Sequence, residues 1–178
     1  VRRALVVADM PFLSYQVSTA QALENAGRFL KEAGADAVKL EGGSLRAPTV
    51  RALTANGIPV LAHIGITPQS LRAMGSYKVQ GKTPREAEIL LQDARDLAEA
   101  GAFALVLEGL PAALGGAITA AVPIPTISIG AGPQCDGQIL VVHDLLGLFE
   151  GFTPKFVKRY ANLAASMKTA FAAYRNEV

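Results

Sequence analysis

The chain has 178 residues, of which 51% are hydrophobic and 18% charged, with a formal net charge of +2. It is too apolar for a disordered chain, and its charges are too mixed for a polyanion binder, so nucleic acid is not an expected partner. The single Cys135 excludes an intrachain disulfide and any multi-cysteine metal site. No apolar run approaches the roughly 20 residues of a membrane helix and no signal peptide is evident, so we expect a cytoplasmic protein without membrane contact.

Short apolar runs alternate with longer amphipathic stretches along the chain. The runs predict strands at residues 4–8, 37–40, 59–62, 103–107, 125–129 and 139–142. Their nearly continuous hydrophobicity is typical of parallel strands that are covered on both faces. Apolar residues at helical spacing predict helices at 19–33, 84–100, 111–121 and 155–175. This alternation predicts an α/β fold with a parallel sheet, and residues 1–178 are expected to form one domain.

Several helix ends carry their own signals. Gly34 is a C-cap signal for the first helix, and Thr83 with Glu86 forms a capping-box pattern at the start of the second. The apolar stripes of the long helices are interpreted as core rather than as cofactor contacts; the stripe of the last helix comprises Phe156, Tyr160, Leu163 and Met167. Residues 74–82 are the one long irregular segment, and we expect a loop near the functional site there.

Polar or ionisable residues end nearly every predicted strand. They are Asp9, Glu41, His63, Glu108, the glycine turn at 130–132, and Asp144. In parallel α/β folds this edge carries the chemistry, because strand-to-helix loops converge on it. The last two groups are weaker candidates: close backbone packing explains the glycine turn equally well, and His143 and Asp144 are interpreted as structural. Cys135 is interpreted as a bystander thiol.

Lys39 and Glu41 share one face of their predicted strand, because side chains alternate with a period of two. Opposite charges on a nearly buried strand are costly unless they are paired or bound to a metal. A structural ion pair is one interpretation. Equivalent strand-end positions of Asp9, His63 and Glu108 favour a functional site instead. Carboxylates without a cysteine cluster favour a hard cation such as Mg²⁺ over zinc.

Each residue type at this edge allows specific chemistry. Lys39 is either a Schiff-base amine or a fixed cation for a substrate carboxylate, and Glu41 beside it favours the cation. His63 is a general base, a hydrogen-bond donor or a structural residue. Glu108, emerging from an apolar wall, is a candidate general base.

Seven stretches of the sequence together resemble the ketopantoate hydroxymethyltransferase family. They are residues 7–12 (VADMPF), 38–43 (VKLEGG), 62–70 (AHIGITPQS), 77–81 (YKVQG), 107–111 (LEGLP), 129–132 (IGAG) and 136–138 (DGQ). They occur in order over essentially the whole chain, and several are long and unusual.

The resemblance implies a (β/α)8 TIM barrel of the phosphoenolpyruvate mutase and isocitrate lyase type. It also implies an enzyme that makes ketopantoate, on the route to pantothenate and coenzyme A, from 2-oxoisovalerate and 5,10-methylenetetrahydrofolate with Mg²⁺. By resemblance, Asp9 and Glu41 are metal ligands, Lys39, His63 and Asp9 lie at the keto acid, and Glu108 accepts the proton from C3 through an enolate mechanism. The family forms homo-oligomers, commonly decamers.

Two features depart from the family pattern. Only about six of the eight βα units are present, with no counterpart of the family's first strands or of the metal ligand they carry. The chain also begins without Met, directly before an apolar strand, so we expect a longer natural protein. Two other functions stay open: a lyase or aldolase-like barrel enzyme of the same superfamily with Lys39 as the Schiff base, and an inactive assembly subunit.

Overall fold

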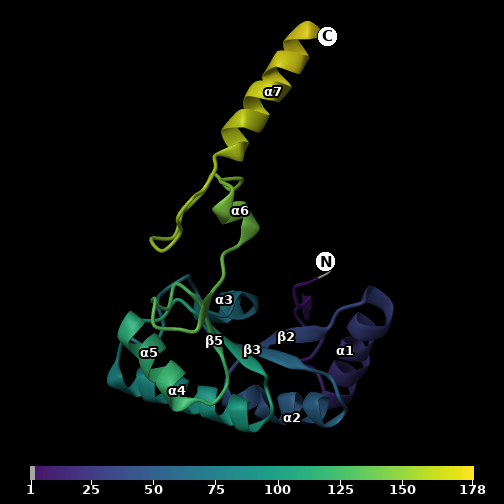
Figure 1. Ribbon diagram of the computed structural model, residues 1–178, viewed down its shortest axis with the longest axis vertical. Helices are drawn as coiled ribbons and strands as arrows, with labels where there is room; N and C mark the ends of the chain where they lie inside the picture. The colour runs from purple at the N-terminus through teal and green to yellow at the C-terminus, as the bar shows by residue number, and fades with distance from the viewer. Residues whose placement is uncertain (1–2) are drawn as a thin grey trace. The chain divides into compact units, whose positions relative to one another are not determined.

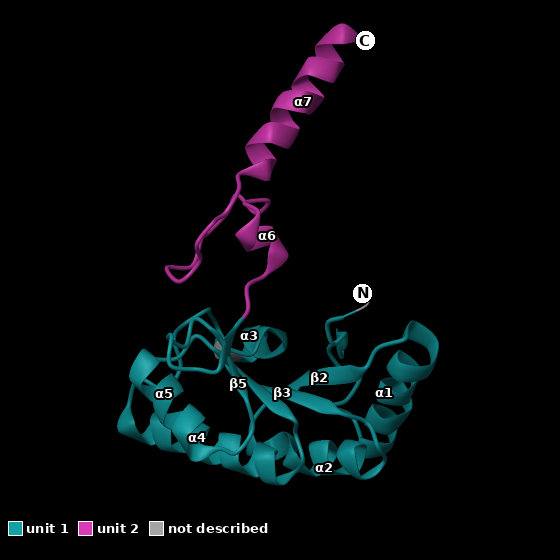
Figure 2. Ribbon diagram, viewed as in Figure 1, with its two compact units in different colours: residues 1–138 teal, residues 139–178 magenta. Residues whose placement is uncertain are grey.

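The computed structural model describes residues 3–178, except for the side chain of residue 74. Residues 1 and 2, which belong to the unusual chain start noted above, lie outside the described part. The chain divides into two compact units, residues 1–138 and 139–178 (Figure 2). The expectation of one domain over residues 1–178 stays a prediction. None of the helices in the described part is long and apolar enough to cross a membrane.

The first unit is built on a six-stranded parallel sheet (Figure 1). Its strands are β1 (Val7–Asp9), β2 (Ala37–Glu41), β3 (Val60–Gly65), β4 (Ala104–Glu108), β5 (Thr126–Ile129) and β6 (Gly137–Gln138). Each strand pairs with the next one in the sequence, in the order β1 to β6. Strand order in a doubly wound sheet reverses at a switch point, whereas a barrel wall adds its strands in sequence. The sheet is therefore a half-barrel, which confirms the expected α/β barrel-type fold.

Helices cover the outer face of this sheet. They are α1 (Thr19–Ala33), α2 (Ala47–Ala55), α4 (Pro84–Glu99) and α5 (Ala112–Ala121), which Figure 1 shows along one side of the strands. The short 3-10 helices η1 (Ser44–Arg46) and η2 (Pro68–Ser70) follow β2 and β3, and α3 (Leu71–Met74) follows η2. The predicted caps are present: Gly34 is left-handed with φ 67°, and Thr83 and Glu86 form the reciprocal capping box.

The two faces of the sheet carry different residues. The outer face packs against the helices in one large apolar core, which includes Val38, Leu40, Val60, Ala62, Ile64, Leu105 and Leu107. The inner face has a smaller apolar cluster formed by Leu61, Ala104, Val106 and Ile129. Alternation along the strands places Lys39, Glu41, His63 and Glu108 on this same inner face, at its carboxyl edge. The inner face thus ends in charged groups at the edge where barrel active sites lie.

The predicted strand at 139–142 is wrong. β6 ends at Gln138, and the short helix α6 (Val142–Leu145) follows. The pairing of β6 with β5 ends with Gln138 beside Ser128, and the apolar residues that follow join no strand pair in the described part of the chain. Ile139, Val141 and Val142 are accordingly exposed. The first strand also differs: it starts at Val7 rather than at residue 4, and Leu5 is exposed.

The last helix begins later than predicted and does not form a core. It is α7 (Leu163–Glu177). The backbone N–H groups of Tyr160 and Leu163 donate to the carbonyls of Leu145 and Leu146, so they are not available for an earlier helix start. The expected core stripe is wrong as well, because all four of its residues are between 38% and 67% exposed: Phe156, Tyr160, Leu163 and Met167.

Asp93 on α4 fixes the turn that follows β2. Its Oδ1 accepts hydrogen bonds from the Ser44 N–H at 2.7 Å and from the Ser44 hydroxyl at 2.6 Å. A Cβ at Gly43 would collide with the Asp93 carboxylate. We therefore expect Gly43→Ala to expel Asp93 from these two bonds and to lower the free energy of unfolding by about 1–3 kcal/mol, measured by urea denaturation.

The matched control for this variant is Gly27→Ala in the middle of α1. A Cβ there meets only Lys31 Cε, at 3.9 Å. Alanine at this position should therefore stabilise the protein by about 0.5–1 kcal/mol, because glycine is a poor helix former. Equal effects of the two substitutions would show that the space at Gly43 does not matter.

Candidate active site

Lys39 lies at the centre of a charged cluster at the carboxyl edge of β1, β2 and β3. Its Nζ is 2.8 Å from Asp9 Oδ1, 3.4 Å from Glu41 Oε1 and 3.4 Å from His63 Nδ1. The side chain of Lys39 is 17% exposed and that of Glu41 is 4% exposed. Two carboxylates therefore surround one ammonium that is partly reachable from solvent.

The strand register brings these residues together. Asp9 lies beside Lys39 in the β1–β2 pair, and Glu41 lies beside His63 in the β2–β3 pair. Gly65 lies beside Glu108 in the β3–β4 pair. Gly65 has a φ of 100°, and a Cβ there would collide with the Glu108 carbonyl oxygen. Only glycine fits this position, and the close approach fixes the strand end that carries Glu108.

His63 connects the cluster to Glu108. Its Nε2 lies 3.2 Å from Glu108 Oε2, and its Nδ1 lies 3.7 Å from Glu41 Oε1. Nε2 is buried and makes no hydrogen bond of good geometry. Its contact with Glu108 is therefore an ion pair and not a hydrogen bond. Burial alone would lower the pKa of His63, but Glu108 and Glu41 outweigh it and raise the pKa above 6.5.

Glu41 is held at both its backbone and its carboxylate. Its Oε2 accepts the Gln69 backbone N–H at 3.0 Å, and its own N–H donates to the Tyr15 hydroxyl at 3.1 Å. Burial alone would raise the pKa of Glu41. The contacts with His63, the Gln69 N–H and Lys39 together lower that pKa below 4.5. Glu41 is therefore a carboxylate at neutral pH.

This lowered pKa predicts a pH-dependent stability. A carboxylate whose pKa is lower in the folded state stabilises the fold above its unfolded pKa of 4.5, and this contribution is lost as the pH falls through the folded value. Glu41→Gln should therefore be less stable than the wild type near neutral pH, with a gap that narrows below about pH 4.5. Urea midpoints across this range measure the gap, with the exposed Glu88→Gln as control. A gap that stays constant with pH would contradict the assignment.

Five residues predicted from the sequence are thus brought together: Asp9, Lys39, Glu41, His63 and Glu108. His143 and Asp144 lie on α6 in the second unit, so the prediction that Asp144 ends a strand is wrong. In the glycine turn, the Ala131 N–H donates to Ser128 Oγ at 2.9 Å, which closes the turn on itself.

Tyr15 and Gln69 are contacts that the sequence analysis did not single out. Tyr15 is 1% exposed and Gln69 is half-buried. They are 54 residues apart in sequence, yet the Tyr15 hydroxyl donates to Gln69 Oε1 at 2.8 Å. Tyr15 follows the strand that ends in Asp9, and Gln69 follows the strand that carries His63. That placement is the signal that would have drawn attention to them.

The donor set at Lys39 fits a hard divalent cation. Asp9 and Glu41 each place a carboxylate oxygen beside the Lys39 ammonium group. Two negative charges therefore lie close together beside one positive charge. Carboxylate oxygens are the ligands that Mg²⁺ prefers. Within the described residues, no group of three or more His, Cys, Asp or Glu side chains is arranged to hold a metal ion. Two protein carboxylates suffice for Mg²⁺, which usually keeps several waters or substrate oxygens.

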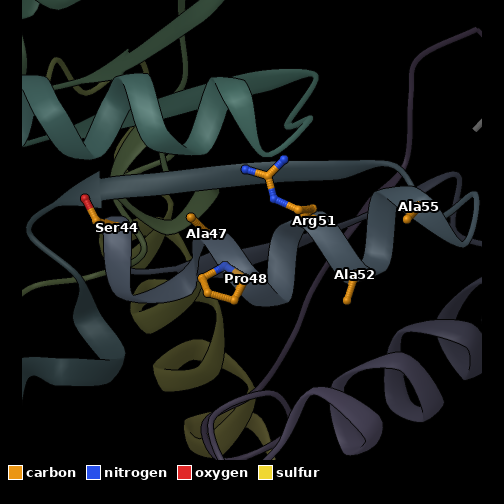
Figure 3. Close-up of a pocket in the computed structure, with 6 residues that line it drawn as sticks. All are labelled: Ser44, Ala47, Pro48, Arg51, Ala52 and Ala55. Carbon is orange, nitrogen blue, oxygen red and sulfur yellow. The ribbon is translucent and has the colours of Figure 1, made fainter.

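A shallow depression of about 500 Å³ lies on the surface of α2 (Figure 3). Its lining comes from η1 and α2, namely Ser44, Ala47, Pro48, Arg51, Ala52 and Ala55. None of the five clustered residues lines it. The chemistry at the strand ends therefore does not involve this depression.

A parallel barrel wall with carboxylates, a lysine and a histidine at its carboxyl edge has the arrangement of a (β/α)8 barrel active site. The family model described as ketopantoate hydroxymethyltransferase matches residues 1–178. The chain belongs to this family.

Similar proteins are found in several bacteria. A protein of Syntrophobacter fumaroxidans named 3-methyl-2-oxobutanoate hydroxymethyltransferase is 59% identical over 177 residues, covering 99% of this chain and 63% of its own length. One of the same name from Moorella thermoacetica is 62% identical over 175 residues, covering 98% of this chain and 65% of its own length. The chain therefore spans just under two thirds of these relatives. A solved isomerase from Streptomyces coelicolor is 19% identical, covers 70% of this chain and 32% of its own, and superposes with a TM-score of 0.44, too distant to carry an argument.

Proposed function

We propose that the protein is a 3-methyl-2-oxobutanoate hydroxymethyltransferase that makes ketopantoate from 2-oxoisovalerate and 5,10-methylenetetrahydrofolate in the cytoplasm. The observation that carries the proposal is the connected cluster at the strand ends, in which Lys39 contacts Asp9, Glu41 and His63, and His63 contacts Glu108. The same five residues lie in the sequence stretches that resemble the family.

Lys39 and His63 would hold the keto acid. The Lys39 ammonium is partly exposed and lies between two carboxylates, which suits it to receive the substrate carboxylate as a third anionic partner. His63 lies between the two groups, with Nδ1 3.4 Å from Lys39 Nζ and Nε2 3.2 Å from Glu108 Oε2. His63 would then orient Glu108 and the substrate oxygen atoms.

Glu108 would act as the base. Its side chain is 17% exposed, so a substrate can reach it. The C3 proton moves to a Glu108 carboxylate oxygen, and the electron pair of the C–H bond becomes the C2–C3 double bond of an enolate. C3 then bonds to the methylene carbon of the folate, and the enolate returns to the ketone. Both bonds from that carbon to the folate nitrogens break, water supplies the hydroxyl oxygen, and the two nitrogens take up one proton from that water and the proton held by Glu108.

Asp9 and Glu41 would hold Mg²⁺. When bound, this ion supplies Lewis-acid stabilisation of the negative charge that develops on the keto oxygen. The low pKa of Glu41 supports this role, because a metal ligand must be deprotonated.

The lyase or aldolase alternative requires an uncharged Lys39 amine that attacks the carbonyl carbon. The 2.8 Å contact with Asp9 and the nearby Glu41 favour the ammonium instead, so the geometry favours the transferase. An inactive assembly subunit would bind neither metal nor keto acid.

We also propose a homo-oligomer, decameric as the family resemblance implies. Large apolar side chains on α7 support an association surface: Met167, Phe171 and Tyr174 are 47%, 66% and 68% exposed. Light scattering after gel filtration of the full-length protein measures the subunit number.

The direct test is product formation by the full-length protein. Incubation with 2-oxoisovalerate, 5,10-methylenetetrahydrofolate and Mg²⁺ should give ketopantoate, identified by mass spectrometry. Omission of the folate should stop the reaction. Protein that binds both substrates and forms no ketopantoate would refute the proposal.

A further inference from the structure

Tyr15 and Gln69 form a hydrogen-bonded bridge that contacts Glu41. The Tyr15 hydroxyl accepts the Glu41 N–H at 3.1 Å and donates to Gln69 Oε1 at 2.8 Å. Gln69 Nε2 in turn donates to the Met10 carbonyl at 2.7 Å. The bridge therefore links the segment after β1 to the segment after β3.

The bridge restrains Glu41 at two points. Tyr15 fixes the backbone of Glu41, and the Gln69 backbone N–H binds the carboxylate at Oε2. Oε1 is left to face Lys39 and His63. The side chain of Gln69 is itself held by hydrogen bonds with the Tyr15 hydroxyl, Gln16 Nε2 and the Met10 carbonyl, which restrain the residue whose N–H binds Oε2. The direction of Oε1 is thus set by residues from two neighbouring segments and not by β2 alone.

We propose that Tyr15 and Gln69 are positioning residues that aim the Glu41 carboxylate at the divalent cation and the keto acid. This inference rests on the proposed function, because it takes Glu41 as a cation ligand. Groups that hydrogen-bond to metal-ligating residues typically change metal affinity or activity 10–100-fold when removed.

The test compares Tyr15→Phe, Gln69→Met and the double variant in the full-length protein. Phenylalanine leaves the Glu41 N–H without its acceptor. Methionine removes all three side-chain hydrogen bonds of Gln69, with Tyr15, Gln16 and Met10, while keeping its backbone N–H. Matched controls are Tyr160→Phe, at an exposed tyrosine before α7, and Gln92→Met, at an exposed glutamine on α4. Two quantities are measured: the dissociation constant of Mn²⁺ alone, by electron paramagnetic resonance, and kcat and KM for 2-oxoisovalerate.

Each single variant should weaken Mn²⁺ binding by about 10–100-fold and raise the KM for the keto acid, with a smaller change in kcat. The double variant should lose no more Mn²⁺ affinity than whichever single variant binds Mn²⁺ more weakly, because the two residues act as one unit. The controls should match the wild type. If Tyr15→Phe does not fold, as judged by circular dichroism, the half-exposed Gln69→Met alone decides the result.

Wild-type affinity for Mn²⁺ in folded Gln69→Met would overturn the positioning role. If the losses of Mn²⁺ affinity in the two single variants multiply in the double variant, the claim that Tyr15 and Gln69 act as one unit would be overturned. Failure of the proposed function gives a different pattern, since the wild-type protein itself would then bind neither Mn²⁺ nor 2-oxoisovalerate.

Discussion

Glu108→Gln should abolish exchange of the C3 proton of 2-oxoisovalerate while leaving binding of the keto acid largely intact. Glutamine has nearly the same shape as glutamate, but its amide cannot accept the proton. General-base catalysis typically contributes 10²–10⁴-fold, so exchange should fall by about that factor. Nuclear magnetic resonance of the substrate in deuterated water measures the rate, and calorimetry measures binding.

Glu88→Gln on α4 is the matched control, because Glu88 is exposed and lies outside the cluster. It should exchange the proton at the wild-type rate. Exchange by Glu108→Gln near the wild-type rate would show that another group is the base. Loss of exchange together with loss of binding would instead make Glu108 a substrate contact.

Lys39→Met should have the second largest effect, on binding of the keto acid. Removing one partner of a buried charge pair costs about 2–5 kcal/mol, which corresponds to a loss of affinity of roughly 30-fold or more. The variant also leaves Asp9 and Glu41 without the cation between them, which weakens the fold. Calorimetric titration with 2-oxoisovalerate measures the affinity, with the exposed Lys31→Met on α1 as control.

Borohydride distinguishes the two roles of Lys39. The fixed-cation role predicts no covalent adduct when wild-type protein and keto acid are treated with borohydride. An adduct mapped to Lys39 by mass spectrometry, and absent from Lys39→Met, would favour the lyase or aldolase-like enzyme.

The sequence predicted the cluster because of two local regularities. A period of two in the strands places Lys39 and Glu41 on one face, and parallel strands present their carboxyl ends at one edge. These rules need no knowledge of which strands are neighbours, so Asp9, His63 and Glu108 could be assigned to the same site. The helix caps at Gly34 and Thr83 were predictable for the same reason, since they depend on a few adjacent residues.

The features that the sequence did not reveal depend on contacts between distant residues. The Tyr15–Gln69 bridge joins two loops that come together only after three strands have paired. The apolar run at 139–142 resembles a strand, but the described pairing of β6 with β5 ends at Gln138, before this run. The start of α7 at Leu163 is set by backbone bonds to residues 145 and 146. The nine-residue α2 was missed because its apolar pattern, with Val50 and Leu53, is too short to be distinctive.

The central claim is that this cluster forms an enolate from a 2-oxo acid with the help of a divalent cation. Deuterium exchange at C3 of 2-oxoisovalerate, measured on the full-length protein with and without Mg²⁺, tests it most directly, since it requires no folate. The account predicts exchange that depends on Mg²⁺ and on Glu108. Bound keto acid that does not exchange its C3 proton in the presence of Mg²⁺ would contradict it.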